Sequence, residues 1–275
     1  MLSKLISYEF KATRRIFLPA YGVLLALSIL NGIFIALPDS ILDRITMPFG
    51  VILTIYIFAM FAVCVLTFAY MINRFYKNLL GDEGYLMFTL PARPSQLIWA
   101  KCIASTLWMF ITAVLCCVSL ILLVTPGLIS HGHLILDADF TNFWQELSFA
   151  IRSIWHNYSF HTITLPILYI IIGIIWTANF CMHIYACLSI GSLATKHRLG
   201  FAFLAYLGFG IVWEIIVMLS ASLSDLFPAN WDLATFSNMT QMYVFCAVMI
   251  VYSIIKLVIN FVITNYILSK RLNLQ

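Results

Sequence analysis

The sequence predicts an all-α polytopic membrane protein: one domain, residues 1–275, with six membrane-spanning helices and both termini in the cytoplasm. The first observation is composition, since 63% of the residues are hydrophobic and only 9% are charged. Soluble globular proteins carry about 25% charged residues, so this chain is not expected to be soluble. The second observation is six apolar runs of the length that crosses a bilayer, about 20 residues each. The third is the distribution of basic residues.

The first element, residues 1–15, is expected to form an amphipathic helix on the inner membrane surface. Its apolar residues Leu2, Leu5, Ile6 and Phe10 recur near helical spacing. Positive charge that attracts anionic lipid headgroups comes from Lys4, Lys11, Arg14 and Arg15. A plain basic tail that orients the first span is the alternative.

The six spans follow in order, at about residues 16–37, 49–72, 102–124, 165–190, 199–223 and 242–268. Gly22 and Ala26 lie one turn apart in the first span and could form a close-packing face. Pro126 is expected to end the third span, because proline lacks the N–H that continues a helix. An outer loop, residues 126–161, follows it. Within that loop, residues 142–158 repeat aromatic and aliphatic side chains with helical period, which predicts a second interfacial helix.

The orientation follows from the basic residues. Lys and Arg collect on the cytoplasmic side of multi-spanning proteins. With the N-terminus inside, two of the 15 basic residues, Arg44 and Arg152, lie outside, and Lys256 lies within a span. The other twelve lie inside: Lys4, Lys11, Arg14, Arg15, Arg74, Lys77, Arg93, Lys101, Lys196, Arg198, Lys270 and Arg271.

A polar cytoplasmic loop, residues 73–101, joins the second and third spans. Asp82 can cap a short helix in which Leu86 and Leu90 fall on one face, with Met87 beside them. Pro91 ends this helix. Two interpretations remain open at this point. The helix folds back onto the bilayer surface, or its apolar side chains dock a soluble partner.

Two charged residues, Glu214 and Lys256, lie within predicted spans. A charge at the middle of a bilayer costs at least ~2.5 kcal/mol and is usually paired or lines a polar pathway. At 1.5 Å per residue, Glu214 lies roughly 22 Å and Lys256 roughly 18 Å from the inner ends of their spans. We expect an ion pair that joins the fifth and sixth spans. In the alternative, Glu214 reaches the outer interface and Lys256 faces a cavity.

The sequence contains no motif of a nucleotide-binding or hydrolytic site. It has no G-x-x-x-x-G-K-[ST], no H-E-x-x-H and no G-x-S-x-G. We therefore expect no catalytic residue, no cofactor in this chain and no enzymatic activity. A metal site is not expected either, because the spacing of His131, His133, His156 and His161 does not place pairs on one helix face. The basic residues are scattered at span ends, so nucleic acid is not an expected partner.

The segment Glu83 to Pro91, EGYLMFTLP, followed ten residues later by Lys101, resembles the first cytoplasmic loop of type 2 ATP-binding-cassette (ABC-2-type) exporter permeases. The pattern of that family is roughly E-G-[TY]-L-x-x-x-L-P, about nine residues and a Lys. The basic N-terminal segment, the six spans and the cytoplasmic termini agree with the family. The outer loop after the third span is longer than in compact members, which is a departure.

The resemblance implies a coupling helix that contacts a separate ATPase subunit. The residues that would make this contact are Asp82, Glu83, Gly84, Tyr85, Leu86, Met87, Phe88, Leu90 and Pro91. ATP and Mg would be bound by that ATPase partner. The chain would pair with a second permease chain, identical or related, among the lipids of a bacterial cell (plasma) membrane. It would export an amphiphilic or hydrophobic substrate such as a peptide, lipid or drug.

Two other functions remain open. The chain could be an ion- or proton-coupled secondary transporter that uses Glu214 and Lys256, although it shows no inverted-repeat halves of the kind found in such transporters. It could also be a membrane scaffold or receptor that transports nothing.

Overall fold

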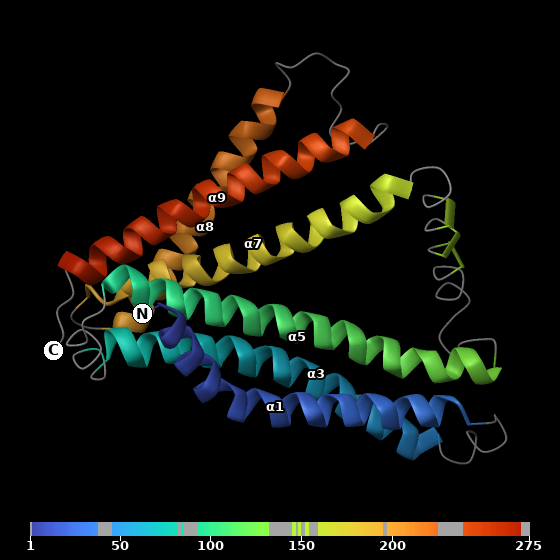
Figure 1. The fold of residues 1–275 in the computed structure, drawn as a ribbon. Helices are drawn as coiled ribbons and strands as arrows, with labels where there is room; N and C mark the ends of the chain where they lie inside the picture. Colours follow the sequence, from blue (N-terminus) through green and yellow to red (C-terminus); the bar gives the residue numbers. More distant parts are fainter. Residues whose placement is uncertain are drawn as a thin grey trace. The chain divides into compact units, whose positions relative to one another are not determined.

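The computed structural model describes residues 2–37, 46–81, 84, 93–131, 159–194, 197–224 and 239–270, together with a few positions between 145 and 153. Six long helices fill these ranges (Figure 1): α1 (Leu2–Ile35), α3 (Thr46–Phe75), α5 (Pro94–His131), α7 (Ser159–Gly191), α8 (Arg198–Ser224) and α9 (Met239–Lys270). A short π-helix, η1 (Tyr76–Leu80), continues α3. All six long helices contain a segment that is long and apolar enough to cross a membrane. The predicted all-α polytopic class is confirmed.

Helix α1 runs unbroken through both the predicted surface segment and the first span. Its buried positions form one stripe with a spacing of three or four residues: Glu9, Thr13, Phe17, Tyr21, Leu24, Ser28, Asn31, Gly32 and Ile35. In the first fifteen residues the buried members of this stripe are polar, and the basic side chains of the segment are exposed. The apolar residues Leu2, Leu5, Ile6 and Phe10 are half-buried. The buried face of the first span therefore begins well before the span itself.

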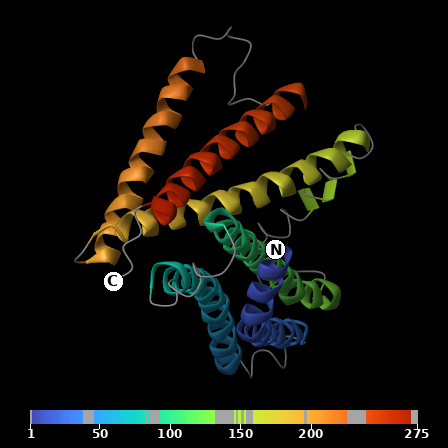
Figure 2. The ribbon, with the colours of Figure 1, turned by 60° about the vertical axis from the view of Figure 1, so that its left-hand side comes forward.

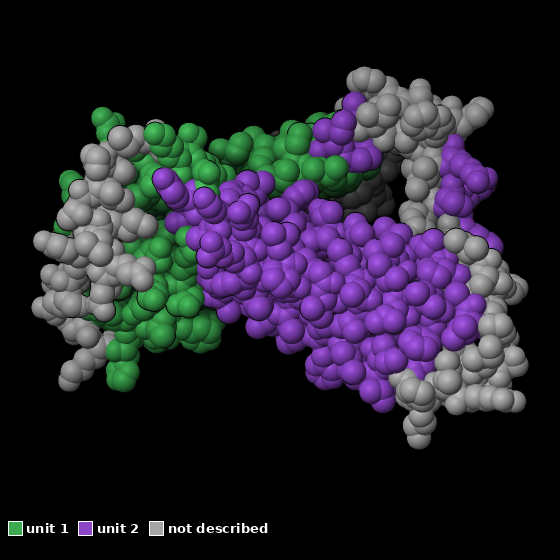
Figure 3. Space-filling view, turned by 60° about the horizontal axis from the view of Figure 1, so that its bottom comes forward, with its two compact units in different colours: residues 1–7, 71–106, 168–275 green, residues 8–70, 107–167 purple. Residues whose placement is uncertain are grey.

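Two compact units divide the described helices (Figure 3). Unit 1 holds residues 1–7, 71–106 and 168–275, and unit 2 holds residues 8–70 and 107–167. Helices α1, α3, α5 and α7 each contribute residues to both units.

Unit 2 is built from α1, α3 and α5 around a core rich in aromatic residues. The Phe17 and Trp108 rings lie 4.8 Å apart between centroids, and the Phe17 and Tyr70 rings meet edge-on at 5.4 Å. The fully enclosed core consists of Phe17, Tyr21, Leu24, Ile35, Tyr56, Val63, Trp108, Leu123 and Val124.

Side-chain hydroxyl groups form a polar ladder through the same core. Thr112 of α5 contacts the Tyr21 hydroxyl of α1 at 2.7 Å and the Thr67 hydroxyl of α3 at 3.1 Å. Farther along α5, Ser119 contacts the Tyr56 hydroxyl of α3 at 2.9 Å, and its carbonyl accepts a hydrogen bond from Ser28 of α1. Lipid supplies no hydrophobic force between helices, so hydrogen bonds of this kind help to hold them together.

Helix α5 continues through Pro126 to His131, whereas the sequence placed its end at that proline. Proline cannot donate to the carbonyl of Leu122, four residues earlier. Gly32 of α1 lies against that carbonyl: a Cβ atom at Gly32 would be 2.7 Å from the Leu122 oxygen and 3.0 Å from Pro126 Cγ. Only glycine allows α1 to come this close. Gly22, the residue favoured from sequence, has no atom within 4 Å of its Cβ position, so the close-packing face predicted at Gly22 and Ala26 is wrong within this chain.

Unit 1 contains α8, α9, most of α7 and the adjoining ends of α3 and α5. Its helices α7, α8 and α9 converge where α7 ends and α8 begins, and they spread apart toward their other ends (Figures 1 and 2). At the converging end a Cβ atom on Gly191 would lie 2.6 Å from Ala202 Cβ. The connecting turn includes His197, whose φ is 55°. The Phe75 and Tyr185 rings stack at 3.9 Å and join α3 to α7.

Candidate functional site

The predicted ATPase contact, Asp82 to Pro91, lies outside the described residues except for Gly84. Gly84 is buried, and its N–H donates to the Gly81 carbonyl at 2.8 Å. The chain on both sides is anchored by buried apolar residues: Leu79 and Leu80 before the segment, and Leu97 and Ile98 after it. Lys101, the lysine of the family-like pattern, is also buried, in α5. The contact itself stays a prediction.

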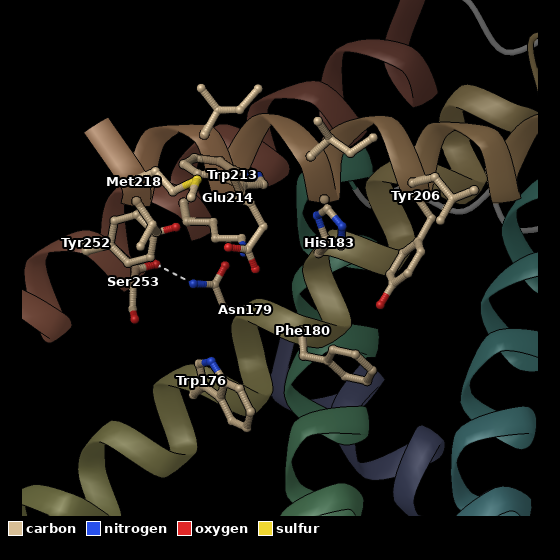
Figure 4. A pocket seen from close by; sticks show the side chains of 16 residues that line it. Trp176, Asn179, Phe180, His183, Tyr206, Trp213, Glu214, Met218, Tyr252 and Ser253 are labelled. Carbon is tan, nitrogen blue, oxygen red and sulfur yellow. Dashed lines mark hydrogen bonds between the residues drawn. The ribbon is translucent and has the colours of Figure 1, made fainter. Parts of the chain in front are cut away.

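A cavity of about 530 Å³ lies within unit 1, between α7, α8 and α9 (Figure 4). Helix α7 lines it with Trp176, Asn179, Phe180 and His183. These four residues follow the i, i+3, i+4, i+7 spacing of a single helix face. Their face combines two aromatic rings with an amide and an imidazole, so the cavity is amphipathic on its α7 side.

Both charged residues predicted within spans line this cavity. Glu214 is on α8 and is exposed, and Lys256 is on α9 and is half-buried. The Lys256 Nζ lies 5.1 Å from the centroid of the Trp213 ring. The structure therefore brings the two charges to one cavity. Lys256 lines this cavity, which is one part of the alternative interpretation given above. A direct ion pair between them stays a prediction.

Three polar residues that the sequence analysis did not single out complete the site. The Asn179 Nδ2 donates to the Ser253 carbonyl at 2.8 Å and ties α7 to α9 (Figure 4). Among the described residues, Asn179 Oδ1, His183 Nδ1 and Trp213 Nε1 are buried without a hydrogen-bond partner. Asn179 is 4% exposed, and His183 and Trp213 are each 7% exposed. An unsatisfied buried polar group costs about 1–3 kcal/mol, so three around one cavity make it a candidate site for a polar ligand.

The signal that could have found Asn179 and His183 is their i, i+4 spacing in a span that carries no formal charge. Formal charge within spans identifies Glu214 and Lys256 but not neutral polar residues such as these two.

Three polar groups of the cavity lie at similar distances from the converging helix ends, whereas His183 lies nearer, about 12 Å from Gly191 at 1.5 Å per residue. Along their helices, Asn179 lies about 18 Å from Gly191, Lys256 about 21 Å from Lys270 and Glu214 about 24 Å from Arg198, at 1.5 Å per residue. Because the hydrocarbon core is about 30 Å thick, groups at this distance from the helix ends are expected inside it. A polar, charged cavity at this depth is a candidate binding site for a substrate or a coupling ion.

Comparison of the chain with protein-family models, curated proteins and solved structures yields no match. The function therefore has to be argued from the sequence pattern and from the site.

Proposed function

We propose that this chain is the membrane-spanning permease subunit of an ATP-driven ABC exporter that moves an amphiphilic or hydrophobic substrate out of the cell. The observation that carries the proposal is the EGYLMFTLP segment, Glu83 to Pro91, placed between the second and third membrane-spanning helices. The chain has no ATP-binding motif of its own, which fits a protein whose ATPase is a separate subunit.

The helices on either side of this segment connect it to both compact units of the chain. Helices α3 and α5 flank it, and each of them contributes residues to both compact units. A partner that grips residues 82–91 and closes on ATP would therefore displace two helices that reach both units. The amphipathic cavity in unit 1 supplies a place for cargo with a polar head.

The direct test is co-purification of the tagged chain with the ATPase encoded beside it. We expect the ATPase to be recovered with the wild-type chain and to be lost with Leu86→Asp or Phe88→Asp. Ala12→Asp is the matched control, because it adds the same charge at an exposed position of α1. It should retain the ATPase. Recovery of the ATPase with Leu86→Asp and Phe88→Asp at wild-type yield would contradict the proposal.

A second candidate function, ion- or proton-coupled secondary transport, is favoured by the presence of Glu214, Lys256 and His183 at one cavity within the membrane. Transport assays in vesicles that contain the chain distinguish the two functions. The exporter requires ATP and the ATPase and resists an uncoupler. The secondary transporter moves its substrate without ATP and without the ATPase, and this transport stops when an uncoupler collapses the proton gradient. A scaffold or receptor shows no flux in either case.

A further inference from the structure

Two hydrogen-bond acceptors, Asn179 Oδ1 and the Glu214 carboxylate, belong to residues that line the unit 1 cavity. The Asn179 side chain points toward Glu214, and its Oδ1 has no hydrogen-bond partner among the described residues (Figure 4). An amide oxygen and a carboxylate both accept hydrogen bonds, so neither satisfies the other. A primary ammonium satisfies both, because it carries three N–H donors and a positive charge.

Lys256 gives the same cavity a positive charge. Its Nζ rests on the ring of Trp213 at 5.1 Å from the centroid, and that ring meets the Tyr252 ring edge-on at 5.9 Å. The aromatic contact holds the ammonium in place without neutralising it. An ammonium held in this way within a span offers a binding partner to a phosphate or carboxylate.

On its α8 side the cavity also has apolar lining that reaches the surface of the chain. Ile211, Ile215 and Met218 of α8 line it, and Met218 is 70% exposed. These three side chains offer hydrocarbon surface to an alkyl chain that leaves the cavity along α8. The volume of about 530 Å³ falls in the range of about 300–1,000 Å³ that is usual for small-molecule sites.

We propose that this cavity binds the head group of a zwitterionic amphiphile that carries a primary amine. The ammonium binds Glu214 and Asn179 Oδ1, the anionic group binds Lys256, and the alkyl chain lies along α8. This deepens the proposed function and rests on it for one point: in an exporter, such an amphiphile is the cargo. The binding step itself needs no ATPase.

The test titrates the purified full-length chain, in an uncharged detergent, with lysophosphatidylethanolamine whose acyl chain is brominated. Bromine quenches the fluorescence of nearby tryptophans, and Trp176 and Trp213 line the cavity. We expect saturable quenching. Lysophosphatidylglycerol, which has no amine, should bind about tenfold more weakly, and so should lysophosphatidylcholine, whose quaternary amine has no N–H donor.

Variants locate the binding within the cavity. Glu214→Gln and Lys256→Met should each weaken it about tenfold or more. Lys256→Arg, which keeps the charge, should retain it and shows that position 256 tolerates substitution. Glu146→Gln is the matched control for Glu214, since Glu146 is exposed and outside the cavity. Equal quenching by the three head groups, quenching that never saturates, or wild-type binding by Glu214→Gln would overturn the proposal.

Two further measurements separate the sources of such an amphiphile. Native mass spectrometry of the extracted chain that shows bound phosphatidylethanolamine identifies a bilayer lipid. ATP-driven movement of the lysophospholipid by the chain with its ATPase identifies cargo, and either result supports the site. If the ATPase co-purifies and the lysophospholipid does not bind, the site fails and the exporter stands. If it binds and no ATPase associates, the exporter fails and the site stands.

Discussion

The ammonium of Lys256 lies 5.1 Å from the centre of the Trp213 ring, so a cation on α9 rests against an aromatic face on α8. This contact explains how a lysine is kept inside a membrane-spanning segment. A cation over a tryptophan ring gains about 0.5–2 kcal/mol, and more when water is excluded. The same ring is 7% exposed and packs edge-on against Tyr252, so it joins the two helices in two ways.

The first prediction concerns this pair. Trp213→Leu should lower the stability of the purified chain by about 2–4 kcal/mol, since it removes a buried ring and the cation contact together. In a double-mutant cycle with Lys256→Met, the two effects should fall short of additivity by about 0.5–2 kcal/mol. Thermal unfolding of the four proteins in one detergent measures this. Trp176→Leu serves as the control, because Trp176 is 71% exposed and should cost little. Strict additivity would show that the ring and the ammonium do not interact.

The second prediction concerns the hydroxyl ladder of unit 2. Thr112→Val keeps the shape of the side chain but removes the partner of both Tyr21 and Thr67. Interhelical hydrogen bonds in membranes contribute about 0.6 kcal/mol on average and up to about 1.7 kcal/mol, so a loss of about 1–2 kcal/mol is expected. The measurement is again thermal unfolding. Thr125→Val is the comparison, because the exposed Thr125 hydroxyl donates to a carbonyl of its own helix. Equal effects of the two substitutions would argue against the ladder.

The third prediction concerns the crossing of α1 and α5. Gly32→Ala should destabilise the chain by about 1–3 kcal/mol, because its new Cβ would lie 2.7 Å from the Leu122 oxygen and force the helices apart. Gly22→Ala should be neutral or slightly stabilising, since its Cβ meets nothing within 4 Å and alanine favours the helix. Unfolding temperatures of both variants decide the matter. A harmless Gly32→Ala would mean that the crossing is looser than described.

The fourth prediction concerns two cysteines in unit 2. The sulfur atoms of Cys64 on α3 and Cys116 on α5 lie 3.9 Å apart, and neither is in a disulfide. A disulfide requires about 2.05 Å between sulfurs, a distance that small side-chain movements supply. A membrane-permeant oxidant should therefore link these two residues, as detected by mass spectrometry of the joined peptides. Cys64→Ser should abolish that product. Cross-linking of Cys116 to any cysteine other than Cys64 would contradict the described packing.

The sequence analysis predicted the class of the fold and the six membrane-crossing segments, because hydropathy depends on composition along the chain alone. Counting the rise per residue also placed Glu214 and Lys256 at similar depths, and both line one cavity. The remaining members of the site could not be predicted in the same way. Asn179 and His183 are neutral, and their role depends on which face of α7 turns toward α8 and α9.

Where each helix ends and which residues contact another helix were harder to predict from the sequence than the presence of the helices. Proline at position 126 predicted a helix end, yet α5 continues to His131, and Gly32 of α1 packs against the Leu122 carbonyl to which proline cannot donate. The sequence offered several glycines in the first span and no means to tell which one faces another helix. The segment around Glu83 to Pro91 depends on its family-like pattern, and its partner contact is a matter for the co-purification experiment.

Gly191 of α7 packs so closely against Ala202 of α8 that a side chain at position 191 would not fit between the two helices. The two helices cannot approach more closely at this end, and if they pivot about this contact, a change in their crossing angle moves this end least. The cavity begins near this contact, at His183 and Tyr206, and extends past Glu214, so a rotation of about 5° about the contact would shift a wall about 20 Å away by about 2 Å. A bulkier residue at position 191 would push α7 and α8 apart at this contact. It would thereby widen or narrow the cavity without touching any residue that lines it.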